Sequence, residues 1–314
     1  MTAASAAPLS PPEPISGAQY TITHSEYSAT IASVGASLRE LTFAGRHLVV
    51  PFDADEVRPA FRGATLAPWP NRVVDGLYSF GGVDNILGLS EPERGHALHG
   101  LVGWANFSVV QAGTASVNLR STIEAQVGYP YRLVIDVLFS LSDDGLYSSV
   151  TATNTGADAA PFGTGPHPYL VAGPDGRVDD WSLTLPTAQV LEVTEDRLVP
   201  TGLADVAGTE FDFRASRTIG STFIDHAFTG LERDGGIAEV RVTDASGSGV
   251  AMRWDSACAW VQVHTADRPD TETSRIGLAV EPMTCPPNAF NSGTDLIVID
   301  PGSSTTAGWT IAAL

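Results

Sequence analysis

Four segments of the sequence concentrate histidine, arginine and acidic residues among prolines and aromatics, whereas most other loops are rich in Gly, Ser and Asp. They are APWPNRVVDGLYSFGG, GHALHGLVGW, FGTGPHPYLVAG and GLAVEPMTCPPNAFN. General acid–base catalysis needs imidazole and carboxyl groups that are held within hydrogen-bond reach of a substrate. His167 in the third segment and Glu281 in the fourth are the strongest candidates for such groups.

The neighbours of these two residues explain the choice. His167 lies between Pro166 and Pro168, whose fixed φ angles restrict the backbone on both sides. A rigid imidazole suits proton transfer, although a histidine that merely satisfies loop carbonyls is the alternative. Glu281 ends a five-residue run that is otherwise apolar, directly before Pro282. Burying a carboxylate is costly unless it is hydrogen-bonded or used, and burial raises its pKa toward neutrality.

Other polar residues in unusual surroundings are candidates for binding. Asn71 and Arg72 follow a Pro-Trp-Pro turn, where the arginine either binds a ligand or caps a loop. His96 and His99 form an HxxH pair, but a third metal ligand would have to be a carboxylate at unknown distance, so a metal site is not favoured. Asp225 is flanked by apolar residues and either binds substrate hydroxyls or forms a turn.

Composition excludes several classes of function. The 17 basic residues are all arginine and stand against 36 acidic residues, which gives a formal net charge of −19. Nucleic-acid binding and binding to anionic membranes are therefore not expected. The two cysteines, Cys258 and Cys285, are expected to be buried free thiols. No dinucleotide, phosphate-loop or zinc-protease motif is present, so no cofactor and no metal is predicted.

Short segments of alternating hydrophobicity must position these groups. Turn residues separate them every eight to twelve positions, which predicts an all-β protein, a large antiparallel sandwich. Single helical turns are expected around 53–61 and after Glu281, and hairpin loops at 173–180 and 244–249. Residues 18–314 are expected to form one domain after a flexible leader at 1–17, and the chain is expected to be cytoplasmic. The predicted strands are Tyr20–His24, Ala29–Val34, Leu133–Leu141, Leu146–Thr153, Ala238–Thr243, Val250–Trp254, Trp260–Thr265 and Gly277–Val280.

The order of these segments resembles the aldose 1-epimerase (galactose mutarotase) family from about residue 18 to 313. Five motifs occur in the family's order: NRVVDGLYSFGG, Leu98-His99-Gly100, His167-Pro168-Tyr169, Asp225 before His-x-Phe, and Glu281 at the end of a C-terminal strand. The tail EPMTCPPNAF is similar to that of a bacterial subgroup. Each motif is weakly specific alone, but five in the correct order are a strong signal.

The resemblance implies a mutarotase-type β-sandwich with its site in a cleft on one sheet. It implies that Glu281 is the general base and His167 the general acid. It also implies that Arg72, His99 and Asp225 bind sugar oxygens. Asn71, Tyr169 and Trp260 are added as substrate-binding candidates, the last two because aromatic rings stack on the apolar face of a pyranose.

The expected activity is interconversion of the α and β anomers of a free aldose such as galactose or glucose, by a monomer or homodimer. Two alternatives remain: a phosphorylated or sulfonated hexose as substrate, and a non-catalytic sugar-binding module on the same fold. For the enzyme, a bell-shaped pH profile is expected. Nearby carboxylates are expected to raise the pKa of His167, which would then form the alkaline limb.

Overall fold

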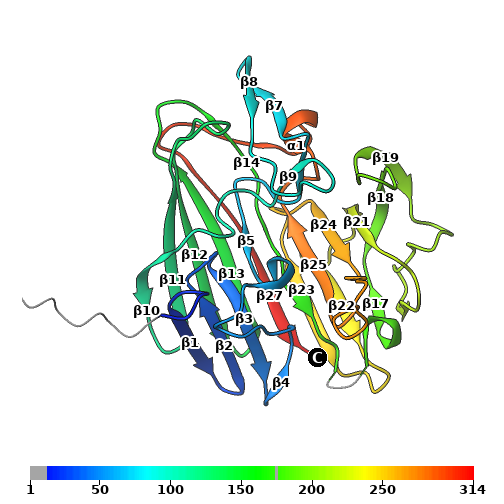
Figure 1. Ribbon diagram of the computed structural model, residues 1–314. Coiled ribbons are helices and arrows are strands. Elements are labelled where there is room, and N and C mark those ends of the chain that lie inside the picture. The colour runs from blue at the N-terminus through cyan, green and yellow to red at the C-terminus, as the bar shows by residue number, and fades with distance from the viewer. Residues whose placement is uncertain (1–12, 174–175) are drawn as a thin grey trace, which may run out of the picture.

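The computed structural model describes residues 13–173 and 176–314, and within them every paired strand of a sheet runs antiparallel (Figure 1). This confirms the predicted all-β sandwich. The helical elements of these residues are three short turns: η1 (Pro59–Phe61), η2 (Val178–Asp180) and α1 (Ala289–Ser292). The first and third confirm the turns expected around 53–61 and after Glu281. None of the described helices is long and apolar enough to cross a membrane.

A nine-stranded sheet forms the back of the molecule (Figure 1). Its four longest strands follow the strong alternation of hydrophobic residues in the sequence. Across the sheet the order is β10 (Ser108–Ala112), β11 (Ser116–Ile123), β12 (Leu133–Ser142), β13 (Gly145–Asn154), β27 (Ser304–Ala313), β23 (Gly249–Trp254), β22 (Ala238–Thr243), β17 (Ser182–Thr184) and β20 (Arg217–Thr218).

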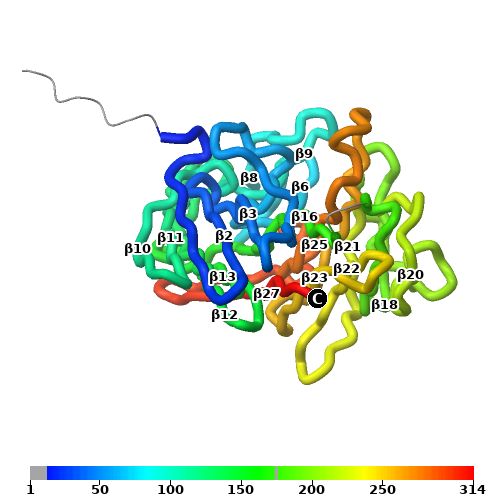
Figure 2. The backbone as a smooth tube through the Cα atoms, turned by 90° about the horizontal axis from the view of Figure 1, so that it is seen from below, coloured from blue at the N-terminus to red at the C-terminus, as the bar shows by residue number. Residues whose placement is uncertain are grey.

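Two smaller sheets cover one face of this large sheet, with β2 and β18 on opposite sides of the molecule (Figure 2). The four-stranded sheet contains β1 (Gln19–His24), β2 (Tyr27–Ala32), β3 (Ser37–Phe43) and β4 (Arg46–His47). The six-stranded sheet has the order β16 (Tyr169–Leu170), β25 (Leu278–Met283), β24 (Trp260–His264), β21 (Asp225–Leu231), β18 (Thr187–Val193) and β19 (Pro200–Asp205).

Four two-stranded pairs connect the sheets and build their rims. They are β5 (Thr65–Leu66) with β15 (Gly165–Pro166), β6 (Arg72–Val74) with β9 (His96–Leu98), β7 (Leu77–Phe80) with β8 (Val83–Ile86), and β14 (Ala160–Phe162) with β26 (Ile297–Ile299). All eight segments that were predicted as strands from their alternation are strands in the structure, with ends that agree or differ by at most three residues.

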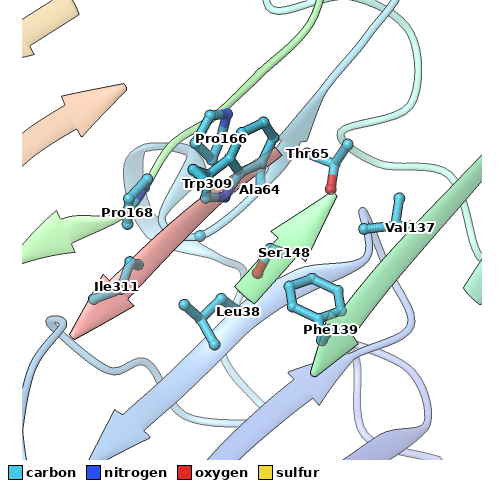
Figure 3. Close-up of a pocket in the computed structure, with 11 residues that line it drawn as sticks. Leu38, Ala64, Thr65, Val137, Phe139, Ser148, Pro166, Pro168, Trp309 and Ile311 are labelled. Carbon is cyan, nitrogen blue, oxygen red and sulfur yellow. The ribbon is translucent and has the colours of Figure 1, made fainter. Parts of the chain in front are cut away.

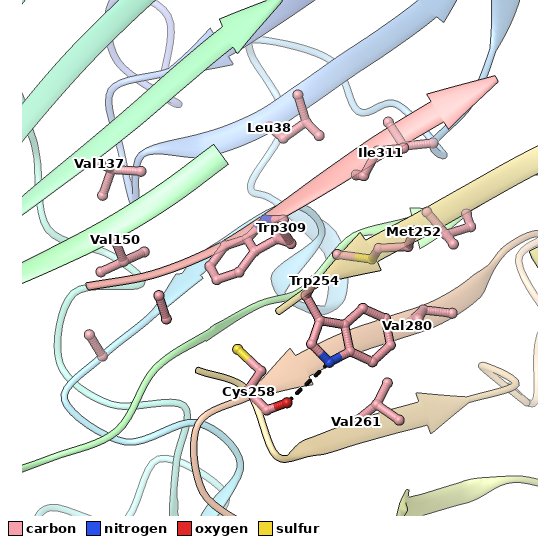
Figure 4. Packing of buried hydrophobic residues seen from close by; sticks show 14 of the residues in the cluster. Leu38, Val137, Val150, Met252, Trp254, Cys258, Val261, Val280, Trp309 and Ile311 are labelled. Atoms are coloured by element: carbon pink, nitrogen blue, oxygen red, sulfur yellow. Dashed lines mark hydrogen bonds between the residues drawn. The ribbon is translucent and has the colours of Figure 1, made fainter. Parts of the chain in front are cut away.

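The core lies between the large sheet and the two smaller ones. Trp254 and Trp309 of the large sheet pack toward Val261 and Val280 of the six-stranded sheet (Figure 4). Both cysteines are buried free thiols, as predicted. A small, mostly apolar cavity of about 20 Å³ lies in the same layer, between Trp309 and the segment that carries Pro166 and Pro168 (Figure 3). It is large enough for about one water molecule.

Strand β25 divides its side chains between this core and the opposite face. Leu278 and Val280 belong to the core, so Glu281, which has the other parity, faces outward. The strand continues past Glu281 to Met283, and the expectation that Glu281 ends it is wrong. Pro282, which lacks an N–H, is tolerated because β16 pairs only with residues 278 and 279, leaving β25 a single partner strand at position 282.

Two loop expectations have different outcomes. Residues 244–249 connect the paired strands β22 and β23, which confirms the predicted hairpin. Residues 173–180 do not form a hairpin, because they lead from β16 in the six-stranded sheet to β17 in the large sheet. Two of these residues, and residues 1–12 of the expected leader, lie outside the described part of the chain. Within the expected leader, Ser16 is buried and bonds to the carbonyl of Ala54 at 2.7 Å.

Replacement of Leu278 by alanine should lower the free energy of unfolding by about 2–5 kcal/mol, because its fully buried side chain would leave a cavity behind the site-bearing strand. Leu203→Ala, in edge strand β19 where the side chain is about half exposed, is the matched control and should change it by about 0.5 kcal/mol or less. Urea denaturation of both variants measures the difference. Equal losses would contradict the assigned core.

Candidate active site

A cleft of about 480 Å³ opens on the outward face of the six-stranded sheet, within the size range of small-molecule sites. Its floor comes from β21, β24 and β25, and its rim from the loops around residues 60, 94, 167 and 268. The lining residues are Ala60, Phe61, Asn71, Arg72, Glu93, Arg94, Leu98, His99, His167, Tyr169, Asp225, Gln262, His264, Asp267, Arg268, Pro269 and Glu281.

Strand register brings the polar residues of the floor together. Gln262 lies opposite Glu281, and His264 lies opposite Asp225 on the other neighbouring strand. The Gln262 side-chain amide donates a hydrogen bond to Asp225 Oδ1 at 2.7 Å, and His264 Nδ1 lies 3.8 Å from the same oxygen. Asp225 is thus a strand residue and not a turn former.

His167 and Glu281 face each other in the cleft, with 3.5 Å between Nε2 and Oε1. The imidazole lies between the rings of Phe61 and Tyr169, which are within about 20° of parallel to it at centroid distances of 6.4 and 5.2 Å. The backbone N–H of His167 donates to the carbonyl of Ala64 at 3.1 Å. Nδ1 of His167 and Oε2 of Glu281 are buried without a hydrogen-bond partner among the described residues. The ring therefore does not serve the loop carbonyls.

Burial dominates the protonation of this pair. It lowers the pKa of His167 to about 3, and the neighbouring His264 acts in the same direction. Burial, together with the negative charge of Asp225, raises the pKa of Glu281 well above its usual value. The expectation that carboxylates raise the pKa of His167 is therefore wrong: desolvation of the imidazolium outweighs their attraction. The two shifts together favour the form of the pair in which His167 is neutral and the proton is on Glu281.

The pKa of Asp225 shifts in the opposite direction to that of Glu281, although only strand β24 separates their two strands. Burial alone would raise the pKa of its carboxyl, but His264, Arg72 and the hydrogen bond from Gln262 hold it below its usual value. The floor thus carries one ionised carboxylate beside one protonated carboxyl group. Environments that separate two carboxyl pKa values in this way are typical of sites with distinct acid–base and binding roles.

Arg72 is fixed at one wall of the cleft by Glu91. Its Nε and Nη2 donate to the two carboxylate oxygens of Glu91 at 2.8 and 3.0 Å, and Arg94 Nη1 donates to Glu91 at 2.9 Å. Asn71 adopts a left-handed backbone, with φ of 55°, and its Oδ1 accepts from the backbone N–H of Arg72 at 2.9 Å. Nη1 of Arg72 has only a long contact with Asn71, at 3.4 Å. Arg72 therefore points into the cleft and does not cap a loop.

The HxxH pair is divided between two surroundings. His96 Nδ1 accepts from the backbone N–H of Asp75 at 3.3 Å, and Nε2 lies 2.8 Å from the carbonyl oxygen of Arg197. Both nitrogens of His96 are thus engaged away from the cleft, and the pair cannot hold a metal together. His99 lines the cleft and packs edge-on against His167, with 5.0 Å between ring centroids. Burial lowers the pKa of His99, so its imidazole is neutral.

The structure brings seven of the eight predicted site residues to the cleft. Trp260 lies outside its lining: it is on the same face of β24 as Gln262, but one step further along, where its indole donates to Asp295 Oδ2 at 2.7 Å. Sequence reasoning missed Gln262 and His264. The alternation of the segment Trp260–Thr265 contained this signal, because it placed both residues on one face of a predicted strand.

The cleft offers a proton donor and acceptor in contact, an ionised carboxylate, three arginines and two further imidazoles. Several buried polar atoms have no described partner: His99 Nδ1, His167 Nδ1, Gln262 Oε1, His264 Nδ1 and Glu281 Oε2. Since buried polar groups are normally hydrogen-bonded, these atoms indicate a ligand with many hydroxyl groups. Among residues 13–173 and 176–314, no cluster of three or more His, Cys, Asp or Glu side chains fits a metal ion.

The sequence is similar to those of known proteins. The family model described as aldose 1-epimerase matches residues 18–312. The uncharacterized protein YihR of Escherichia coli K12 is 37% identical over 288 residues, which cover 91% of this chain and 90% of YihR. The aldose 1-epimerase of the same organism is 29% identical over 187 residues, covering 54% of this chain and 53% of that protein.

Solved structures show the same fold. A GalM/aldose epimerase homologue from Caenorhabditis elegans has a TM-score of 0.84 at 20% identity, covering 95% of this chain and 98% of that one. Galactose 1-epimerase from Lactobacillus acidophilus has a TM-score of 0.78 at 19% identity, with 93% of each chain covered. Because the family model spans nearly the whole chain, the protein belongs to the aldose 1-epimerase family.

Proposed function

We propose that the protein interconverts the α and β anomers of a free aldose. The observation that carries the proposal is the buried contact of His167 with Glu281 in a cleft lined by binding groups. Anomerisation needs one group that takes the proton of the C1 hydroxyl and a second that gives a proton to the ring oxygen. The pair supplies both, and each placed group contributes on the order of 10²–10⁴-fold to such a rate.

The mechanism uses one proton held by the pair. When the sugar enters, its hydroxyls solvate the buried groups and the proton moves from Glu281 to His167 across the 3.5 Å contact. Ionised Glu281 then takes the C1 hydroxyl proton while His167 protonates the ring oxygen. The bond between C1 and the ring oxygen breaks, and an open-chain aldehyde forms. Rotation about C1–C2 exposes the other carbonyl face, and the two groups exchange roles as the ring closes.

The remaining polar residues hold the sugar during this rotation. Asp225 accepts from hydroxyls as an ionised carboxylate, and Arg72 donates through Nη1, the one nitrogen that Glu91 leaves open. Neutral His99 presents an unpartnered Nδ1 to the same cleft. Galactose and glucose are both compatible with this set. A non-catalytic module is disfavoured, because binding alone gives no reason to bury Glu281 against His167.

Glu281→Gln should lower the rate of anomer exchange by roughly 10²–10⁴-fold, because the amide cannot accept the C1 hydroxyl proton. Sugar binding should persist, since the replacement keeps the shape and hydrogen-bonding capacity of the side chain. Magnetisation-exchange NMR on equilibrated glucose or galactose measures the rate, and calorimetry measures binding.

The matched control is Glu192→Gln, which makes the same replacement of a carboxyl by an amide at an exposed position in the same sheet. It should leave the exchange rate unchanged. A Glu281→Gln variant that binds the sugar and exchanges its anomers as fast as the parent would mean that the module is not an acid–base catalyst of this kind.

The pH profile should identify the proton of the pair. In the parent protein, activity requires one proton on the pair, so it falls as pH rises through the raised pKa of Glu281. In His167→Asn the residual activity depends on ionised Glu281 alone, so it should rise with pH through that same pKa. The slope at alkaline pH therefore reverses sign between the two proteins. An alkaline decline that survives in His167→Asn would assign the acid to another residue, with His99 as the first candidate.

A further inference from the structure

Two arginines beside the catalytic pair have no ion-pair partner among the described residues. The formal charge of −19 offers carboxylates in excess, and most cleft charges are paired: Arg72 and Arg94 share Glu91, and Asp267 bonds to Arg275 at 2.8 Å. Arg268 lines the cleft without a side-chain hydrogen bond or ion pair to residues 13–173 or 176–314. Arg62 is likewise unpaired within these ranges.

Arg62 is buried, at 9% exposure, and its Nε has no hydrogen-bond partner among the described residues. Its one side-chain hydrogen bond to the described residues runs from Nη1 to the carbonyl oxygen of Pro51 at 3.3 Å. The pKa of its guanidinium is lowered, first by burial and then by the positive charge of Arg268, while Tyr169 and Glu56 oppose this. Keeping two like charges close together is unfavourable unless an anion joins them.

Both cations act at the Tyr169 side of His167. The guanidinium carbon of Arg62 lies 5.9 Å from the centroid of the Tyr169 ring, and that ring stacks on His167. Burial raises the pKa of the Tyr169 hydroxyl, and the positive charges of both Arg268 and Arg62 oppose this rise. Arg62 therefore lies beside the ring that stacks on His167, and Arg268 brings a second positive charge into the cleft that Tyr169 also lines.

The chemistry of the sugar indicates which substituent reaches them. In the proposed reaction His167 protonates the ring oxygen, which is bonded to C5, and C5 carries C6. Glu281 acts on C1, at the opposite side of the ring oxygen. A group on C6 therefore extends past His167, away from the carbon on which Glu281 acts.

From this geometry we infer that Arg62 and Arg268 form a subsite for an anionic group on C6 of the aldose, such as a phosphate, sulfonate or carboxylate. The inference rests on the proposed function and narrows its substrate class. Guanidinium groups suit this task because their planar N–H pairs match the oxygens of these anions. The subsite gives the alternative of a phosphorylated or sulfonated hexose a structural basis.

The test compares kcat/KM for glucose with that for glucose 6-phosphate, 6-deoxy-6-sulfonatoglucose and glucuronate, by magnetisation-exchange NMR. At least one anionic sugar should exceed glucose by roughly 10- to 100-fold, which is the contribution expected of charge-assisted hydrogen bonds. The three arms distinguish the anion chemistries. Arg268→Gln and Arg62→Gln should each reduce the ratio of anionic to neutral kcat/KM by about tenfold or more.

Arg120→Gln is the matched control, since it removes one positive charge from an exposed ion pair on the large sheet and should leave that ratio unchanged. A second measurement, calorimetric binding of the same four sugars to Glu281→Gln, detects the subsite without catalysis. Two results would overturn the subsite alone. One is a higher kcat/KM for glucose than for all three anionic sugars. The other is a ratio of anionic to neutral kcat/KM in Arg268→Gln that equals the ratio in the parent protein. No acceleration of any of the four sugars would instead overturn the proposed function.

Discussion

The structure depends on one unfavourable arrangement, a carboxyl group buried in the middle of a strand and turned toward an imidazole that is also buried. Leu278 and Val280 hold β25 against the core, and this fixes Glu281 on the cleft face because alternate side chains of a strand point to opposite sides. Desolvation then moves the pKa values of Glu281 and His167 in opposite directions, which leaves one proton for the two groups. The proton movement proposed for catalysis follows directly from this burial.

The rest of the cleft maintains this pair and orients a ligand around it. The rings of Phe61 and Tyr169 lie nearly parallel to the imidazole, which is buried and therefore poorly solvated in its charged form. Asp225 remains ionised only because His264, Arg72 and Gln262 compensate its burial. The large sheet contributes no residue to the cleft. It supplies the core against which the inner face of the six-stranded sheet packs, and the outward face of that sheet forms the cleft floor.

Local sequence signals were sufficient for the fold and for the identity of the pair. Period-two alternation placed Leu133, Ile135 and Val137 on one face of a strand, and all three are buried. The prolines around His167 and the apolar run before Glu281 pointed to the two groups that the structure brings into contact. Alternation gives the face of a residue but not its place along a groove, which is why Trp260 lies outside the cleft. The partners of Arg62 and the balance between burial and charge at His167 depend on segments distant in sequence, and composition cannot supply them.

The measurement that tests the account most directly is the ionisation state of His167 in the free protein, followed by NMR of ¹⁵N-histidine-labelled protein between pH 4 and 8. Comparison with His167→Asn assigns its signals. The account predicts that the His167 ring stays neutral throughout this range, because burial lowers its pKa to about 3. A His167 signal that becomes protonated near the ordinary imidazole pKa of about 6.5 would contradict the claim that burial sets the proton of the pair.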